Sequence, residues 1–485
     1  MIVVNIYEDT IVITKPQRRW LRHLGCGLKI LLISALMMLI SALGTWAWHH
    51  RQITQRLDEA LADLDHSDPG WRLEDIEAGR EEVPEQDNSA RVVMAVARLL
   101  PRNWLPEELG NLLTHLEPEK QLNPADVARL TQELDSVRPA LDEARKLAKM
   151  PRGRHRIVYQ RNVLNTLLQD QAEVRRIVWL LVCDAMRYDQ NGDTANAMIS
   201  CRAALNAARS LGDEPLAVSQ LIRTAAVISV CQAAERTLAQ AEPASKDLEA
   251  FAHLFDSEDS FPDLFITACG ERACAHALFD AIESGDVSVA ELADGRPGWH
   301  ERLFGFLYHD NVRAEHPTML ALMTRWDAIA RLPMPEQAAA ERRFNREIRA
   351  LPETAILTRS LLPALTILGE TSRRKHAYLR CTNAAFAAES YRRKFGAWPV
   401  TIDKLCPNYL SAVPVDPFDG WPLRYHRIED GLLIYSVGRD AVDNNGTLER
   451  ENPMQPGVDI GVRLWDAAKR RQPPRPKPLL EEQPR

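Results

Sequence analysis

The chain has 485 residues, of which 60 are basic and 67 acidic, giving a formal net charge of −7, with 45% apolar and 6% aromatic residues. This composition is that of globular proteins and excludes a chain that is disordered throughout. Nucleic-acid binding depends on clustered Lys and Arg that neutralise phosphates, and the sequence has no such cluster. We therefore expect no nucleic-acid partner. At roughly 150 residues per domain, the length predicts about three units.

An uncharged segment near the N-terminus predicts a transmembrane helix. No charge occurs from Ile30 to Trp48, and a helix of that length covers about 28 Å, enough to cross a bilayer. The basic residues upstream are Lys15, Arg18, Arg19, Arg22 and Lys29. Positive charge favours the cytoplasmic side. We expect a cytoplasmic segment over 1–29, a single-pass signal anchor over 30–48 in the inner membrane, and an extracytoplasmic, periplasmic remainder.

Two other interpretations of this segment remain open. Thr45-Trp46-Ala47 resembles a small-x-small cleavage site, which would make the segment a cleaved signal peptide. A buried helix of a soluble protein is the second alternative. The intact N-terminal peptide in a membrane fraction would favour the anchor.

Residues 49–370 are predicted to form a helical region. A charged amphipathic helix over Arg51 to Asp65 is broken by Asp68-Pro69-Gly70. The segment 68–75 resembles a stretch of uncharacterised membrane-anchored bacterial proteins, and this resemblance implies no activity. From Ser89 to about Leu368, apolar residues recur at helical spacing between proline and glycine breaks. Antiparallel helical hairpins are the expected architecture.

One turn in this region is more specific. Gly192-Asp193 precedes a helix rich in small residues, among them Ala197, Ala203 and Ala204. This pattern resembles the second half of a tetratricopeptide repeat, in which small residues let two helices approach closely. No second copy follows at the repeat spacing. The resemblance implies a helical hairpin, with a peptide-binding groove as the alternative.

Recognisable catalytic motifs of the common hydrolase, zincin, P-loop and dinucleotide classes do not occur in the chain. Ser372 and Lys375 match S-x-x-K, but its partner motifs are missing, and we expect the basic run over 373–375 to lie on an exposed helix surface. His309 and His316 are expected on the polar surface. None of the eight cysteines forms a C-x-x-C pair, although Cys381 and Cys406 could form one local bridge.

The last hundred residues change in composition and predict a small α+β domain. A helix from about Arg373 to Lys394 is followed by Gly396, which suits the residue after a helix end. A short helix over Thr401 to Tyr409 comes next. Two β-like runs, Leu423 to Ile428 and Leu432 to Val437, flank an acidic turn and predict an antiparallel hairpin. We therefore expect a domain over 371–466.

A series of residues in this domain recurs in a recognisable order: Tyr391, Trp398-Pro399, Leu405, Tyr409-Leu410, Val413-Pro414, Asp416-Pro417-Phe418, Pro422, Arg424-Tyr425, 434–438, Asp440 and Asp459-Ile460. Over about 375–465, this order and spacing resemble the C-terminal domain of the major pseudopilin of type II secretion systems. The match covers under a fifth of the chain. It implies a pseudopilin-like α+β fold and a place in or near secretion machinery.

The resemblance also implies a calcium ion, with acidic side chains at the positions of Asp440 and Asp459. Calcium prefers six to eight oxygen ligands from flexible loops. The loop has several such oxygens: Asp440, Asp443, Asn444, Asn445 and Asp459. It departs from the family in having Arg439 beside the ligands and Ala441 in place of glycine. A solvated Asx-rich turn is therefore the alternative.

The N-terminal segment departs from the family as well. A prepilin carries a Gly-[Phe/Met]-Thr-x-x-Glu signal before its apolar helix, whereas this helix follows Gly27-Leu28-Lys29 and contains no glutamate. We do not expect prepilin-type cleavage or polymerisation. The end of the chain, 467–485, is rich in proline and is expected to be a disordered tail.

Taken together, the sequence predicts a mainly α protein with one N-terminal transmembrane helix, an extracytoplasmic helical-hairpin region and a small pseudopilin-like α+β domain. We expect a non-catalytic interaction or scaffold protein that contacts the membrane and other envelope or secretion proteins. The alternative is an extracytoplasmic enzyme whose active site lies in the helical region and cannot be recognised from sequence.

Overall fold

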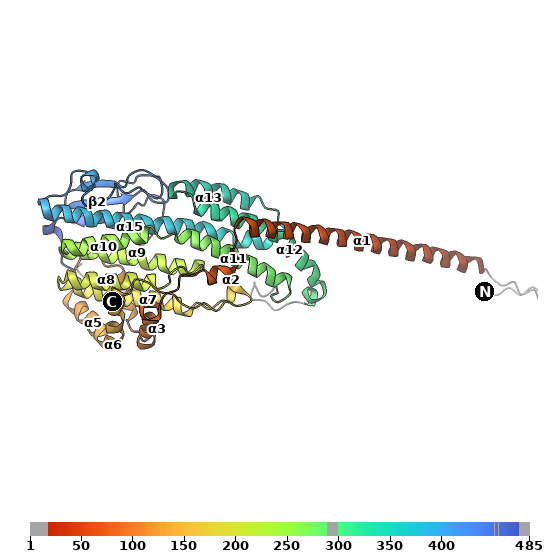
Figure 1. Ribbon diagram of the computed structural model, residues 1–485, viewed down its shortest axis with the longest axis horizontal. Coiled ribbons are helices and arrows are strands. Elements are labelled where there is room, and N and C mark those ends of the chain that lie inside the picture. Colours follow the sequence, from red (N-terminus) through yellow and green to blue (C-terminus); the bar gives the residue numbers. More distant parts are fainter. Residues whose placement is uncertain (1–17, 289–298, 451, 454, 475–485) are drawn as a thin grey trace, which may run out of the picture.

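The computed structural model describes residues 18–288, 299–450, 452, 453 and 455–474, and of 18–28, 30 and 299–309 it describes the backbone alone. The described chain is mainly helical with one small sheet (Figure 1). The helices are α1 Arg18–Ser67, α2 Leu73–Ala78, α3 Ser89–Leu99, α4 Glu107–Thr114, α5 Pro124–Ser136, α6 Arg138–Arg145, α7 Gln169–Gln190, α8 Thr194–Arg209, α9 Ala217–Gln240, α10 Ser245–Asp259, α11 Asp263–Glu283, α12 Trp299–Ala330, α13 Met334–Arg349, α14 Ile356–Leu361 and α15 Pro363–Phe395. The strands are β1 Arg424–Ile428, β2 Gly431–Ser436 and β3 Ile460–Trp465.

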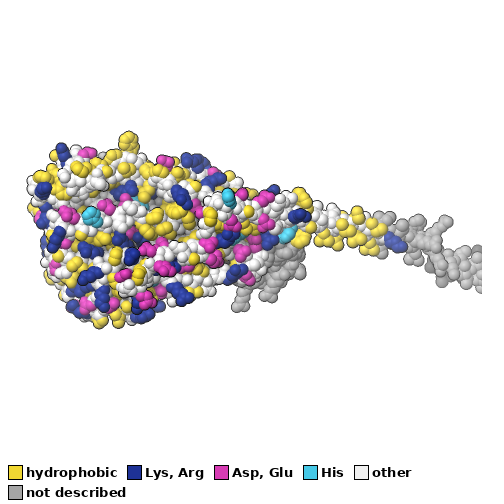
Figure 2. Space-filling view, viewed as in Figure 1, with side chains coloured by type: hydrophobic (Ala, Val, Ile, Leu, Met, Phe, Trp, Pro, Cys, Tyr) yellow, Lys and Arg dark blue, Asp and Glu magenta, His cyan; other side chains and the backbone are white. Residues whose placement is uncertain are grey.

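The first helix, α1, projects away from the rest of the molecule (Figure 1). Its outer part carries an exposed apolar surface over 31–48 (Figure 2). By length and composition this helix can cross a membrane. The same test is passed by α9, but most of that helix is buried inside the body, as a core helix is. The structure therefore contains the N-terminal apolar helix that the sequence predicts.

The inner part of α1 packs against α12 without any break in the helix. Leu57 and Leu64 are buried there in a cluster with Trp71 and Leu320. Nearer the apolar part, Asp310 of α12 accepts hydrogen bonds at 2.8 Å from the Trp46 indole and lies 2.7 Å from the ring of His50. The helix ends at Ser67, before the predicted Asp68-Pro69-Gly70 break. One rod thus joins the apolar stretch to the body.

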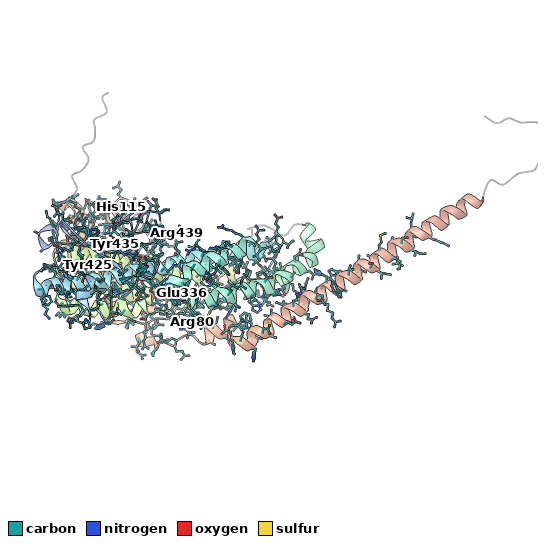
Figure 3. All side chains as sticks on the ribbon, turned by 90° about the horizontal axis from the view of Figure 1, so that it is seen from above. Arg80, His115, Glu336, Tyr425, Tyr435 and Arg439 are labelled. Atoms are coloured by element: carbon teal, nitrogen blue, oxygen red, sulfur yellow. The ribbon has the colours of Figure 1, made fainter. Side chains whose placement is uncertain are left out.

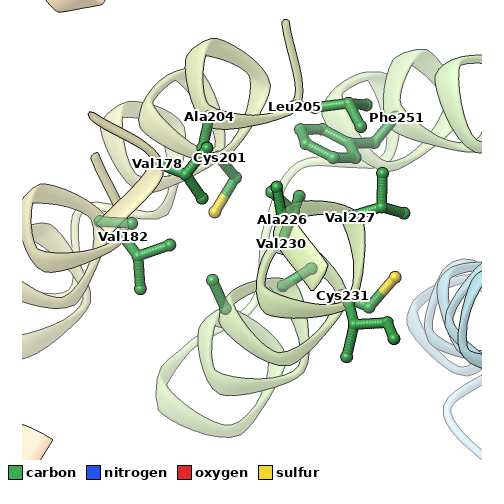
Figure 4. Packing of buried hydrophobic residues seen from close by; sticks show 14 of the residues in the cluster. Val178, Val182, Cys201, Ala204, Leu205, Ala226, Val227, Val230, Cys231 and Phe251 are labelled. Atoms are coloured by element: carbon green, nitrogen blue, oxygen red, sulfur yellow. The ribbon is translucent and has the colours of Figure 1, made fainter. Parts of the chain in front are cut away.

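The body is built of antiparallel helices around a shared apolar core. The inner faces of α7, α8, α9 and α10 meet in this core (Figure 4). Alanines and cysteines such as Cys201 and Ala204 leave little side-chain bulk, which permits close helix packing. Between α7 and α8, Gly192 has φ +75°, and the Asp193 carboxylate accepts from the Asn196 amide at the start of α8. The predicted helical hairpin is confirmed at this turn.

The C-terminal unit consists of α15, the three-stranded sheet and the segments that join them, residues 363–474. Its helix begins at Pro363, ten residues before the predicted start, so the expected boundary at 370/371 falls inside α15. Thr366, Ile367 and Gly369 have poor helix propensity, but packing outweighs it, since Gly369 lies directly against the Glu341 carboxylate of α13. The predicted helix end is confirmed, because Gly396 caps α15 with φ +76°.

The sheet lies on α15 at the end of the molecule opposite to α1 (Figures 1 and 3). It has the order β1-β2-β3, with both pairs antiparallel. The hairpin of β1 and β2 confirms the two predicted runs, and Tyr425 pairs with Ile434. The third strand was not expected, although Ile460, Val462 and Leu464 point one way and are buried. The predicted short helix over 401–409 is a single 3-10 turn, Ile402–Leu405.

The basic run and the first residues of the C-terminal tail lie inside the protein more than the sequence predicts. Within the basic run, Arg373 and Lys375 are buried, because α15 is covered on several sides by α9, α10, α13 and the sheet. At the predicted disordered tail, Arg470 forms a buried ion pair with Glu389. Residue Gln472 then bonds to the 119–121 segment through its backbone N–H and C=O. These contacts hold the start of the tail on the body, and residues 475–485 lie outside the described chain.

Candidate functional site

The predicted calcium ligands lie in the loop between β2 and β3, and backbone amides occupy both carboxylates. Asp440 accepts from the N–H groups of Val442 and Gly457, at 3.0 and 2.8 Å. Asp459 is buried and accepts from Asn444 and Gly446, at 3.3 and 2.8 Å. Within the described residues, no group of three or more His, Cys, Asp or Glu side chains is placed to hold a metal ion. The two carboxylates therefore close the loop on itself through backbone amides.

We expect Asp459→Asn to lower the free energy of unfolding by about 1–3 kcal/mol, because the amide nitrogen of asparagine cannot accept the part-buried Gly446 N–H. Calorimetry of the full chain in EDTA, in millimolar calcium and in millimolar magnesium measures this loss. A structural role predicts the same loss in all three. The calcium ion that the family resemblance implies would instead be supported by two results together: calcium alone raises the unfolding temperature of the wild type, and Asp459→Asn loses stability only in the presence of calcium.

The S-x-x-K pair lies in a closed ionic network. Asp263, the first residue of α11, is 3.1 Å from the Lys375 ammonium and accepts from the Ser372 hydroxyl at 3.3 Å. His376 joins Asp263 to Asp259 of α10, at 3.4 and 2.7 Å. Burial alone raises the pKa of Asp263, but Lys375 and His376 outweigh it and hold that pKa well below its usual range. This ionic network joins α10, α11 and α15.

No room for a substrate is described beside this pair. The cavity that touches Ser372 within the described residues has about 10 Å³, which is less than a ligand needs. His316 is also inside, 2.7 Å from Glu283 and 3.0 Å from His276, so the expected surface position is wrong for it. The side chain of His309 lies outside the described residues. Both Cys381 and Cys406 are free thiols in the structure.

A groove lies between α10, the second half of α15 and the segment 407–415. We call it the seam groove, because it follows the line where the helical body meets the C-terminal unit. It encloses about 650 Å³. Its polar lining comes from Glu249, His253, Asp256, Asp259, Arg380, Asn383 and Tyr409. The volume and mixed lining are those of a ligand site for a small molecule or a few residues of peptide.

Two pairs of side chains fix the walls of the seam groove. Arg380 donates to Asp259 at 3.0 Å and to the backbone carbonyl of Val415 at 2.7 Å, so it ties α15 to α10 and to the 407–415 segment. Three residues further along α15, the Asn383 Nδ2 donates to Asp256 at 2.5 Å. Desolvation and the neighbouring Asp259 raise the pKa of Asp256, while His253 opposes them. The pKa of Asp259 is lowered instead, because His376 and Arg380 outweigh the effect of its burial.

Two polar atoms of this lining are without a partner. Asn383 is 8% exposed, and its Oδ1 accepts no hydrogen bond although its Nδ2 is bound. The Tyr409 hydroxyl on the opposite wall is likewise buried and unbonded. Buried polar groups in folded proteins are almost always paired. Unpaired atoms in the lining of an open groove therefore indicate a place where a bound molecule completes the hydrogen bonding.

The sequence analysis missed this groove, although both helices carry a signal for it. On α15, Arg380, Asn383 and Ser390 recur at helical spacing on one face. On α10, Glu249, Asp256 and Asp259 share a face in the same way. Neither stripe shows that the two helices lie side by side. Comparison of the chain with protein-family models, curated proteins and solved structures finds no match.

Proposed function

We propose that the protein is a membrane-tethered binding protein of the bacterial cell envelope. The apolar part of α1 anchors it with the N-terminus in the cytoplasm, and the body is extracytoplasmic. There the seam groove binds a segment of a partner protein of the envelope or secretion machinery, without chemistry of its own. The observation that carries this proposal is the groove itself, whose lining holds two buried polar atoms without a hydrogen-bond partner in the protein.

The anchor rests on exposure and charge together. The apolar residues of α1 from Leu31 to Trp48 are among the most exposed large hydrophobic side chains of the described chain, and water makes such a surface costly. A bilayer removes that cost. The basic residues that precede this segment support an orientation with its N-terminal end in the cytoplasm.

The C-terminal unit supports a binding role through its resemblance to the pseudopilin domain, combined with its surroundings here. A long helix followed by an antiparallel sheet agrees with that resemblance. However, α9, α10 and α13 cover α15, so its faces are not free to pack against further copies in a filament. We therefore propose a pseudopilin-like module that is reused as one wall of a binding groove, rather than a pilus subunit.

Filling the groove should abolish partner binding. With a photo-crosslinking residue at the exposed position Ser411, on the groove's rim, we expect an adduct with one discrete protein in intact host cells. Ala252→Trp, which puts an indole into the groove from α10, should remove that adduct by steric exclusion. The matched control is Ala250→Trp, on the same helix and similarly half-buried but outside the lining, which should leave the adduct intact.

The topology is checked in the same cells. Protease added to intact spheroplasts should digest the body, and complete resistance until lysis would contradict the extracytoplasmic placement. An adduct that persists at full strength in Ala252→Trp, or that forms equally from a crosslinker at Arg342 on the exposed face of α13, would contradict the groove as the binding surface.

A further inference from the structure

We infer that the seam groove recognises a primary alkylammonium group carried on an aliphatic stem, of the kind that a lysine side chain of a partner protein presents. This inference rests on the proposed binding function and names the ligand chemistry. It follows from three properties of the groove: its net charge, its unpaired acceptors and its apolar floor.

The net charge of the lining is negative. Glu249, Asp256 and Asp259 contribute three carboxylates against the single guanidinium of Arg380. Arg380 is already engaged on both sides, by Asp259 and by the Val415 carbonyl, so it does not offer a free cation to an anionic ligand. His253 stands at the exposed edge of the groove. A cation is attracted to this lining and an anion is repelled.

The unpaired atoms require a hydrogen-bond donor. Asn383 Oδ1 is an acceptor only, and its amide is held in place because Nδ2 donates to Asp256. The Tyr409 hydroxyl can also accept. An ammonium group has three donors and no acceptor, so one such group can bond to the Asn383 oxygen and an Asp256 oxygen together, and a third donor remains for the tyrosine or water. Bonds of this charge-assisted kind are stronger than neutral ones.

The rest of the floor is apolar. It is formed by Leu248, Ala252 and Phe255 of α10 and by Leu379, Phe386 and Ala387 of α15, and the rings of Phe255 and Phe386 stack with centroids 5.7 Å apart. This surface can pack against the methylene stem of the ligand, as apolar protein surfaces pack against lysine stems elsewhere. A compact cation such as ammonium or guanidinium alone would leave it exposed. The groove therefore selects for both the charge and the stem.

The test uses the full-length protein in a neutral detergent and measures binding by calorimetry. The probes are an acetylated, amidated tripeptide with a central lysine, the same peptide with norleucine, the same peptide with Nε-acetyl-lysine, and spermidine as a free polyamine. We expect the lysine peptide to bind at least tenfold more tightly than the norleucine or acetyl-lysine peptide. Tight binding of the peptide with weaker binding of spermidine assigns the site to a protein side chain, and the reverse assigns it to a polyamine; both support the alkylammonium chemistry.

Two variants locate the site. Asp256→Asn and Asn383→Leu should each weaken binding of the lysine peptide about tenfold, since each removes one of the groups that bond to the ammonium. The matched control is Asp247→Asn on the same helix but outside the lining, which should leave the affinity within twofold. Asp256 is exposed in the absence of ligand, so its variant is expected to fold normally.

Equal affinity for the lysine and norleucine peptides, or unchanged affinity in Asp256→Asn, would overturn the inference. Failure here is separable from failure of the proposed function. A crosslink at Ser411 that Ala252→Trp removes, together with no preference for lysine, rejects the ligand chemistry and leaves the binding groove standing. If neither the Ser411 crosslink nor the preference for the lysine peptide is found, both the binding function and the ligand chemistry are rejected.

Discussion

Asp263→Asn is expected to lower the free energy of unfolding by about 3–5 kcal/mol, the range seen when one partner of a buried ion pair is removed. Lys375 has no exposed surface, and its nearest carboxylate oxygen belongs to Asp263, at 3.1 Å. Once Asp263 is neutral, the buried ammonium loses its nearest counter-ion. Chemical denaturation of the full chain in neutral detergent, followed by circular dichroism, measures the loss.

A double substitution separates the ion pair from simple damage to packing. Lys375→Met keeps the length of the side chain and removes the charge, so the double variant with Asp263→Asn should recover a large part of the stability lost in the single variant. The reference is Glu249→Gln on the exposed face of α10, which should change stability by less than about 0.5 kcal/mol. If the double variant were as unstable as the sum of the two single variants, the coupling between the charges would be absent.

Glu258 should make the body sensitive to acid between about pH 5 and pH 2. This carboxylate is buried between Arg209 and Arg223, at 3.0 and 2.9 Å, and so joins α8, α9 and α10. Its burial raises the pKa, but Arg223, Lys375 and Arg209 together outweigh that effect and lower the pKa to about 2. A carboxyl with a folded pKa below its unfolded value stabilises the protein above the unfolded pKa. That stabilisation, about 3 kcal/mol, is lost as the pH falls toward the folded pKa.

The difference between wild type and Glu258→Gln isolates this group from the other carboxylates. We expect the variant to be less stable at pH 7 and the two proteins to converge as the pH falls from 5 to 2, because the wild-type side chain then also becomes neutral. Unfolding free energies at several pH values in that window give the curve. A difference that does not change with pH would show that the Glu258 charge contributes nothing to stability.

The features that the sequence predicts correctly depend on local signals. The exposed apolar stretch of α1, the turn at Gly192-Asp193 and the cap at Gly396 are each encoded within a few residues, by hydrophobicity or by glycine in a left-handed conformation. The Asp416-Pro417 turn is of the same kind. There the structure adds that Asp416 is buried and accepts from the Ser436 hydroxyl and the Val437 amide, which connects the turn to β2.

The features that the sequence does not reveal depend on which elements meet. Arg373 and Lys375 were expected on a surface because a basic run is usually solvated, but Glu341 and Asp263 from two other helices pair with them inside the protein. The third strand was missed because it pairs with β2 across a long polar loop. For the same reason the seam groove was not foreseen, since Asp256 and Asn383 become neighbours only when α10 packs on α15.

Because α1 is one unbroken helix, its direction determines the orientation of the body. A protein on a flexible linker samples many orientations, whereas here one continuous helix runs from the exposed apolar stretch into the contact with α12. A tilt of α1 therefore tilts the whole molecule. The sheet lies at the end of the molecule far from α1 (Figure 1). In the proposed orientation it is therefore held away from the lipid headgroups, and a partner protein can approach it only from a limited range of directions.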